Sequence, residues 1–124
     1  MGSRVLIVPG LHNSGPNHWQ TWLERKHPQY CRVNQRNWDD PSLDEWVDNL
    51  EKAIQKSSEP IVIVAHSFGC LVAARAALRP NLPIRGALLV APASPSRFGV
   101  VDAMPYKRLP FPSVVLLKSL NHFA

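Results

Sequence analysis

The chain has 124 residues, of which 45% are hydrophobic, a composition typical of a globular protein with a buried core. We therefore expect one domain spanning residues 1–124. The sequence shows neither a basic-then-apolar leader nor an apolar run long enough to span a bilayer, so we expect a cytoplasmic protein without a membrane partner. The two cysteines make no disulfide framework, which fits a reducing compartment.

The formal net charge of +5 raises the question of nucleic acid as a partner. Lysine and arginine are scattered, however, and the only local concentrations are Arg25-Lys26 and Lys107-Arg108. No motif for binding RNA or DNA accompanies them. The pattern predicts a solvated basic surface and no nucleic-acid partner.

The first predicted strand, Arg4–Pro9, is almost entirely apolar, as is typical of a central strand in a parallel sheet. A turn-rich loop follows at residues 10–16, with two glycines at the spacing of a phosphate-binding P-loop. That motif needs a lysine next, and this chain has Pro16, which offers no N–H, so the P-loop interpretation fails. The alternative is a loop that supplies an oxyanion-hole N–H, for which Leu11 is the candidate.

A helix is predicted after this loop. Pro16 suits the first position of a helix. Trp19, Trp22 and Leu23 then recur at helical spacing through about Lys26, which indicates an apolar face.

Four titratable residues in this region invite a catalytic interpretation. His12 and His18 match no metal-ligand spacing, and no carboxylate lies near them in sequence, so we expect each to form local hydrogen bonds. Asp39 and Asp40 could be catalytic carboxylates, but a turn and the negatively charged start of the next helix explain them better. No metal site and no cofactor are predicted.

Cys31–Asn34 is predicted as a short strand nearer the edge of the sheet. Ser42 and Glu45 form a capping box, which indicates the start of a second helix. The apolar face of that helix comprises Leu43, Trp46, Val47, Leu50, Ala53 and Ile54.

The stretch Ile61–Ala65 reads as a strand buried on both faces, and residues 71–78 are rich in strong helix formers. Ser67 lies between them, flanked two residues away by the small residues Ala65 and Gly69. This strand, turn and helix is the layout of a nucleophile elbow, which raises the serine hydroxyl above the carboxyl edge of the sheet. We predict that Ser67 is the nucleophile, although an ordinary helix N-cap is the alternative.

The helix after Ser67 points its first N–H groups at any developing negative charge, so the N–H of Phe68 is predicted to complete the oxyanion hole with that of Leu11. Further strands are predicted at Ile84–Ala91 and Ser113–Lys118. The connection between them, Pro92–Pro112, shows no helical period and has the length of a functional loop. Candidates for a substrate pocket are His12, His66, Phe98, Met104 and Tyr106.

Strands that alternate with helices predict an α/β fold with a parallel sheet and helices on both faces. The expected architecture is a three-layer sandwich like that of the α/β-hydrolases, with about five strands in the order 2-1-3-4-5.

The sequence resembles the small α/β-hydrolases of the YdeN and retinoblastoma-binding-protein-nine type. The stretches that carry the resemblance are Val8–Trp19, Asn37–Pro41, Val64–Cys70 and Leu109–Ser113. The resemblance implies a single-domain serine hydrolase with a Ser–Asp–His triad, no cofactor and a small-molecule acyl substrate.

The end of the sequence departs from the family pattern. In the family the fifth strand leads into Asn-Asp-Pro, whose aspartate is the triad acid, whereas Asn121-His122-Phe123 stands here. The last strand and last helix, with the triad histidine, are also missing. We therefore expect a C-terminally incomplete domain, truncated or frame-shifted, that has lost both triad partners of Ser67. A site in which His122 takes part is the less favoured alternative.

Three functions follow from these observations. The favoured one is a serine hydrolase acting on carboxylic esters through Ser67, impaired in this chain. The second is a catalytically inactive binding or scaffold domain on the same fold. The third, a nucleotide-binding domain, lacks its Gly-rich fingerprint. The incomplete domain should also leave an apolar sheet face and an edge strand exposed, which favours self-association.

Overall fold

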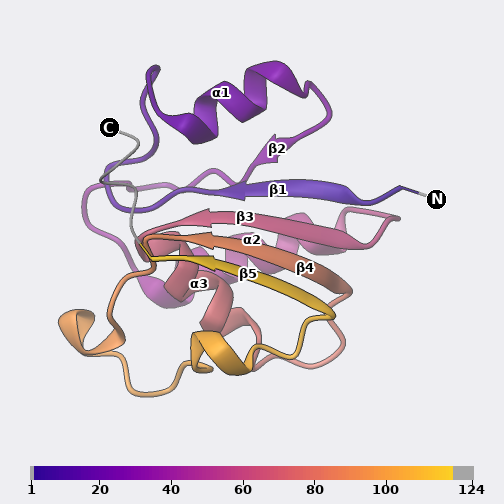
Figure 1. The fold of residues 1–124 in the computed structure, drawn as a ribbon. Helices are drawn as coiled ribbons and strands as arrows, with labels where there is room; N and C mark the ends of the chain where they lie inside the picture. Colours follow the sequence, from indigo (N-terminus) through magenta and orange to yellow (C-terminus); the bar gives the residue numbers. More distant parts are fainter. Residues whose placement is uncertain (1, 119–124) are drawn as a thin grey trace.

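The computed structural model describes residues 2–118. Five strands form one parallel sheet in the order β2-β1-β3-β4-β5 (Figure 1). The strands are β1 Arg4–Val8, β2 Cys31–Arg32, β3 Ile61–His66, β4 Ile84–Val90 and β5 Ser113–Leu117. The predicted order of the strands is confirmed.

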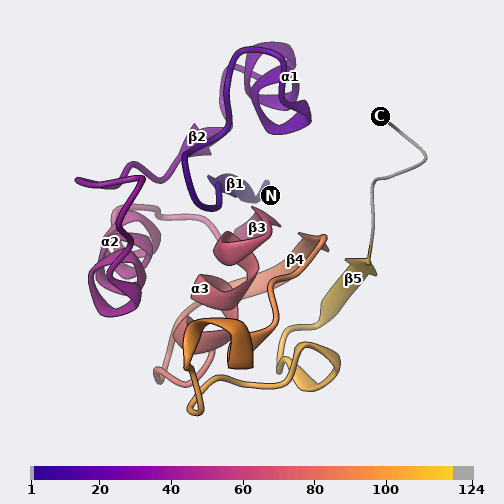
Figure 2. The same cartoon turned by 90° about the vertical axis from the view of Figure 1, so that its left-hand side faces the viewer.

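Within residues 2–118, three α-helices cover the two faces of the sheet. The helices are α1 Trp19–Lys26, α2 Leu43–Gln55 and α3 Phe68–Ala76. Figure 2 shows α2 and α3 on one side of the sheet and α1 on the other, which is the predicted three-layer arrangement. The long connection between β4 and β5 contains two short 3-10 helices, Pro95–Phe98 and Tyr106–Arg108.

The hydrophobic core lies between the sheet and the pair α2 and α3. Alternate residues of each strand face this layer, because side chains along a strand alternate between the two faces. Strands β1, β3 and β4 contribute to it, together with Trp46 of α2 and Leu71 of α3. The buried strand residues on this face include Leu6, Val8, Ile61, Ile63, Ala65, Ala87 and Leu89.

Helix α2 begins where the capping residues predict. The Ser42 hydroxyl accepts a hydrogen bond from the Glu45 N–H at 3.3 Å, which satisfies one of the free donors of the first turn. Four residues of its predicted apolar face are buried: Trp46, Val47, Leu50 and Ile54.

Helix α1 differs from the prediction in two ways. It begins at Trp19 with His18 as its N-cap, so Pro16 lies outside it. Its buried residues are Gln20 and Thr21, whereas the side chain of Trp22 is 59% exposed. The expected apolar face was wrong for Trp22, whereas Trp19 and Leu23 are half-buried. The fully buried side of α1 is polar and is held by hydrogen bonds from Gln20 and Thr21.

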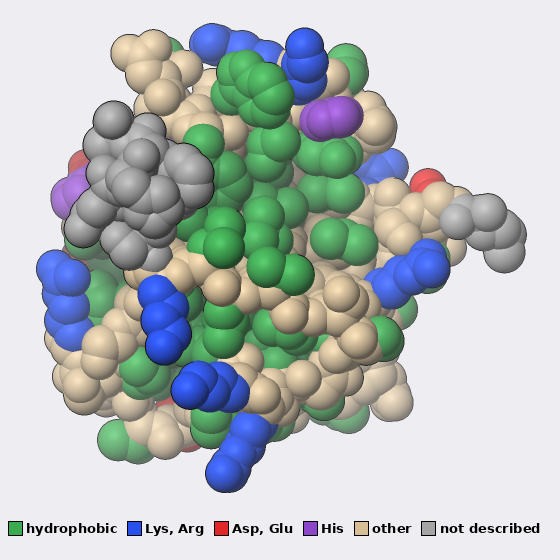
Figure 3. Space-filling model, in the orientation of Figure 1, with side chains coloured by type: hydrophobic (Ala, Val, Ile, Leu, Met, Phe, Trp, Pro, Cys, Tyr) green, Lys and Arg blue, Asp and Glu red, His purple; other side chains and the backbone are tan. Residues whose placement is uncertain are grey.

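The sheet face that carries α1 is covered only in part. Ile7 and Val64 are buried on this face, whereas Val115 and Leu117 of β5 are 50% and 41% exposed. Figure 3 shows hydrophobic side chains gathered on this side of the molecule, with Lys and Arg around them. None of the helices within residues 2–118 is long and apolar enough to cross a bilayer.

Candidate functional site

Ser67 occupies the turn between β3 and α3 in a backbone conformation that is rare for a residue with a side chain. Its φ is 53° and its ψ is −117°. Its N–H donates to the Val90 carbonyl at 3.0 Å, and its carbonyl accepts from the N–H groups of Cys70 and Ala93. Strain of this kind persists only where the surroundings hold it, and it is concentrated at functional sites. The Ser67 side chain makes no capping hydrogen bond, which removes the support for an ordinary N-cap.

The turn packs against the loop after β1 at distances that only glycine permits. A β-carbon at Gly10 would lie 2.8 Å from the carbonyl oxygen of His66 and 3.1 Å from the β-carbon of Ser67. A β-carbon at Gly69 would lie 2.2 Å from the carbonyl oxygen of Val8. The loop at residues 10–15 therefore lies directly beside Ser67.

Two backbone N–H groups at this junction have no acceptor among the described residues. In the part of the chain that the structure describes, the N–H groups of Leu11 and Phe68 donate no hydrogen bond to another residue. The loop itself is well fixed: the N–H of His12 donates to the Trp38 carbonyl at 2.8 Å, and that of Asn13 to the Gly10 carbonyl at 3.1 Å. His12 and Asn13 both have left-handed φ values, 68° and 66°.

Gln20 ties this loop to the sheet, although it was not among the residues predicted for the site. Its side chain is fully buried. Its amide nitrogen donates to the carbonyls of Val8 at 3.3 Å and Val64 at 3.0 Å, and its amide oxygen accepts from the Ser14 hydroxyl. The sequence feature that could have indicated this role is the position of a polar residue between two tryptophans in a predicted helix.

Arg32 supports the same loop from β2. Its guanidinium donates to the side chain of Asn13 at 2.9 Å, the Ser14 carbonyl at 2.8 Å and the Thr21 hydroxyl at 2.9 Å, and pairs with Glu24 at 3.1 Å. The Arg32 side chain is only 12% exposed. The Arg32 guanidinium is therefore engaged by partners within the protein, and these contacts fix the loop.

His12 and Asp39 lie within ion-pair distance of each other, although they are far apart in the sequence. Nδ1 of His12 lies 2.8 Å from Oδ1 of Asp39, 27 residues away, and both side chains are exposed. The expectation of a partner close in sequence was wrong for His12. Among residues 2–118, Nε2 of His12 has no hydrogen-bond partner.

A second aromatic and imidazole cluster lies on the α1 side of the turn. His18 and His66 have ring centroids 4.7 Å apart, and Trp19 lies 6.0 Å from His66. Burial, with the nearby charges of His66 and Arg32, lowers the pKa of His18 to about 4. Burial also lowers the pKa of His66. Both rings are therefore neutral at pH 7, and Nδ1 of His18 caps α1 by accepting from the N–H of Gln20.

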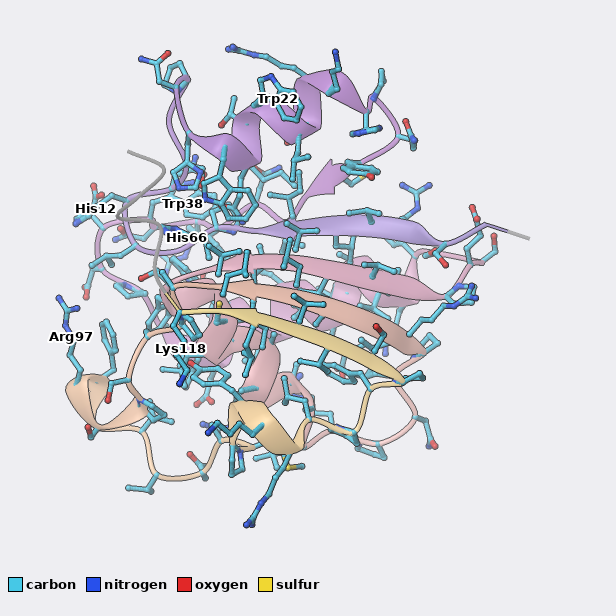
Figure 4. The ribbon with its side chains drawn as sticks, viewed as in Figure 1. His12, Trp22, Trp38, His66, Arg97 and Lys118 are labelled. Atoms are coloured by element: carbon cyan, nitrogen blue, oxygen red, sulfur yellow. The ribbon has the colours of Figure 1, made fainter. Side chains whose placement is uncertain are left out.

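The remaining pocket candidates are spread along the connection between β4 and β5. The hydroxyl of Tyr106 donates to the Ala93 carbonyl at 2.7 Å, close to Ser67. Phe98 stacks edge-on against Phe68 with centroids 4.8 Å apart, on the core side of the turn. The N–H of Met104 donates to the carbonyl of Ala74, about 9 Å along α3 from its first residue, so Met104 lies away from Ser67. Figure 4 shows His12 and His66 at the carboxyl edge of the sheet.

Other chemistry near Ser67 is limited. Cys70 is buried, which raises the pKa of its thiol to about 12, so this cysteine is not an activated nucleophile. Within residues 2–118 no group of three or more His, Cys, Asp or Glu side chains is placed to hold a metal ion. The segment Asn121-His122-Phe123, expected at the position of the triad acid, lies outside the described residues.

Comparison with known proteins places this geometry in a family. Over 74 residues the chain is 34% identical to YdeN of Bacillus subtilis (strain 168), whose name describes it as a hydrolase; the match covers 56% of this chain and 39% of YdeN. The match thus spans well under half the length of that curated relative.

Solved structures of similar proteins have the same fold. A YdeN-like hydrolase from Pectobacterium atrosepticum superposes with a TM-score of 0.83 at 35% identity, covering 90% of this chain and 60% of that one. The YdeN product of B. subtilis has the same fold, with a TM-score of 0.72 at 24% identity, covering 93% of this chain and 71% of that one. The model of the serine hydrolase family matches residues 5–122. The chain belongs to the serine hydrolase family and has an α/β-hydrolase fold.

Proposed function

We propose that Ser67 is the nucleophile of a serine hydrolase site that acts on carboxylic esters. The observation that carries this proposal is the strained Ser67 turn with two unused N–H groups, those of Phe68 and Leu11, at the same junction. A rigid pair of donors beside a serine is the arrangement that stabilises the oxyanion of acyl transfer.

The proposed reaction follows the usual course of covalent acyl transfer. The Ser67 oxygen attacks the ester carbonyl carbon, and its proton passes to a base. The carbonyl oxygen becomes an oxyanion, which the N–H groups of Phe68 and Leu11 hold. The alcohol leaves with a proton, the acyl group stays on Ser67, and water then releases the acid.

The proposed reaction needs a base that accepts the proton of Ser67. Among the described residues, no acid and no histidine hydrogen-bonds to the hydroxyl of Ser67. We propose that residues 2–118 supply no acid and no histidine to a triad with Ser67 and that this chain turns esters over slowly. The same observation favours a second candidate, a catalytically inactive domain that binds small molecules on the same fold.

Covalent labelling separates the two candidates. A fluorophosphonate probe, incubated for hours and followed by peptide mass spectrometry, should modify Ser67 slowly, because the oxyanion donors remain in place. The Ser67→Ala variant should carry no adduct, and Ser58→Ala, which changes an exposed serine in the turn after α2, should be labelled like the parent chain. Absence of an adduct on Ser67 at high probe concentration would support the inactive binding domain.

We further propose that the open sheet face and the outer edge of β5 associate with a second copy of this chain. In the described part of the chain, β5 is the last strand of the sheet and pairs only with β4. An edge strand with exposed Val115 and Leu117 is a ready template for pairing with an identical edge.

A further inference from the structure

A cleft lies between the connection after β4 and the end of β5. Its volume is about 520 Å³, which falls in the roughly 300–1,000 Å³ range of small-molecule sites. The apolar part of its lining is Pro92, Pro105, Leu116 and the ring of Tyr106. We call it the basic cleft, because its other lining residues are Lys107, Arg108 and Lys118.

The three basic residues of the cleft carry charge that no described carboxylate neutralises. Elsewhere in residues 2–118, four arginines each hold a carboxylate: Arg32, Arg36, Arg75 and Arg79. Lys107, Arg108 and Lys118 form no such pair with a described residue, and no acidic residue lines the cleft. Asp102, the acid nearest to Lys107 in sequence, is bound to Arg75 at 3.0 Å. The cleft therefore presents a concentrated positive field next to apolar walls.

The wall of the basic cleft is connected to the proposed nucleophile by two hydrogen bonds. The Tyr106 hydroxyl donates to the Ala93 carbonyl at 2.7 Å, and the Ala93 N–H donates to the Ser67 carbonyl at 3.1 Å. Tyr106 is thereby fixed relative to Ser67.

The cleft also opens at the edge of the sheet where ligands of such folds bind. Pro92 follows the carboxyl end of β4, and Lys118 follows that of β5, which Figure 4 shows at the same edge as His66. In open α/β sheets ligands bind outside the carboxyl ends of the strands.

We propose that the basic cleft binds the anionic end of the substrate, an ester whose acyl part is a short apolar arm ending in a carboxylate or another anionic group. The inference rests on the proposed function, because it assigns the cleft to the substrate of Ser67. Lys107, Arg108 and Lys118 hold the charge, and Pro92, Pro105 and Leu116 line the path of the arm. A cationic or uncharged amphiphile of the same length gains nothing from these three side chains.

Binding can be measured without any chemistry by equilibrium dialysis of radiolabelled octanoate against the Ser67→Ala variant. We expect octanoate to bind, and octanol and octyltrimethylammonium to bind at least about fivefold more weakly. Inorganic phosphate at the same concentration should compete poorly, because it lacks the apolar arm. Equal binding of octanol, or equal competition by phosphate, would overturn the proposal.

A matched pair of variants locates the site. Replacing Lys107, Arg108 and Lys118 together by glutamine should weaken octanoate binding about tenfold, since charge-assisted contacts at exposed sites are individually modest. Replacing three exposed lysines far from the cleft, Lys26, Lys52 and Lys56, removes the same net charge and should change binding less than about twofold.

Both variants should unfold at the same temperature as the parent chain, because they change exposed side chains. Equal losses of octanoate binding in the two variants would show a nonspecific charge effect and would contradict the proposal that the basic cleft binds the anion. This outcome leaves Ser67 untouched, just as a failure to label Ser67 would leave octanoate binding intact, so the two proposals fail separately.

Discussion

Gly69 lies so close to Val8 that a β-carbon on residue 69 would stand 2.2 Å from the Val8 carbonyl oxygen. This contact joins the start of α3 to the end of β1. The backbone carbonyl of Pro9 is also near, at 2.7 Å from the same position. Both obstacles are backbone atoms, so neither can rotate away. The turn that carries Ser67 therefore requires a residue without a side chain at position 69.

The first prediction concerns Gly69→Ala. The added methyl group should force β1 and α3 apart and lower the free energy of unfolding by about 2–4 kcal/mol. Urea unfolding followed by circular dichroism measures the change. Gly15→Ala is the control, because nothing lies within 4 Å of its β-carbon position, and it should shift the free energy by no more than about 0.5 kcal/mol. Equal effects of the two substitutions would contradict the close contact.

The second prediction concerns Gln20→Leu. The variant leaves the carbonyls of Val8 and Val64 without their side-chain donor and removes the acceptor of the Ser14 hydroxyl. Buried polar groups without partners cost about 1–3 kcal/mol each, so we expect a loss of about 2–4 kcal/mol in the free energy of unfolding. Gln55→Leu, at an exposed position of α2, should stay within about 0.5 kcal/mol. A similar loss in both variants would argue against the role of Gln20.

The same residue shows where sequence reasoning reached its limit. Parallel strands with apolar side chains on both faces appear in sequence as continuous apolar runs, so β1, β3, β4 and β5 could all be predicted within a residue or two. In α1 the recurrence of Trp19, Trp22 and Leu23 suggested an apolar face, yet the helix is anchored through Gln20. Periodicity detects apolar burial, and it cannot detect a polar side chain that is buried because its partners are backbone carbonyls.

The pairing of the loop at residues 10–15 with the Ser67 turn was predicted from the layout of the fold. The rest of the candidate site was predictable only where it is local in sequence. The small residues around Ser67 indicate the turn, because strand, turn and helix are consecutive. The contact of His12 with Asp39 joins two loops 27 residues apart, and the link from Tyr106 to Ala93 depends on the path of the long connection after β4. Spacing rules carry no information about such contacts.

The third prediction concerns ester hydrolysis by the chain. No described acid or histidine hydrogen-bonds to the Ser67 hydroxyl, so turnover of p-nitrophenyl acetate should be lower than that of an intact triad by a factor on the order of 10⁴ to 10⁶. Stopped-time absorbance assays of the parent chain and Ser67→Ala should give nearly the same rate. A rate that disappears in Ser67→Ala and in His12→Ala would refute this and identify His12, oriented by Asp39, as the base.

The fourth prediction concerns pH. The pKa of His18 is about 4 in the folded protein, below its ordinary value near 6.5, because burial and the charges of His66 and Arg32 disfavour the protonated ring. As pH falls from 6.5 to 4, His18 therefore binds a proton in the unfolded chain but not in the folded chain. The free energy of unfolding decreases as a result.

The variant His18→Asn isolates this contribution, since asparagine still caps α1 but does not titrate. Between pH 6.5 and 4 the parent chain should lose more stability than the variant, by an amount on the order of 1 kcal/mol after allowance for solvent screening. Urea unfolding at several pH values measures the difference. Parallel pH profiles of the two proteins would show that His18 is not the group responsible.

The last prediction concerns the open edge of the sheet. Val115 and Leu117 are about half exposed on one face of β5, the last strand of the described sheet, and apolar edges of this kind pair with identical edges. Sedimentation velocity at tens of micromolar should show association that increases with concentration, and the purified chain should bind a hydrophobic dye. Replacing both residues by lysine should disperse the assemblies, because like charges on an edge oppose pairing. Val101→Lys, at a 96% exposed position remote from β5 in sequence, should leave association unchanged. A parent chain that sediments as a monomer at all these concentrations and binds no dye would contradict the proposal.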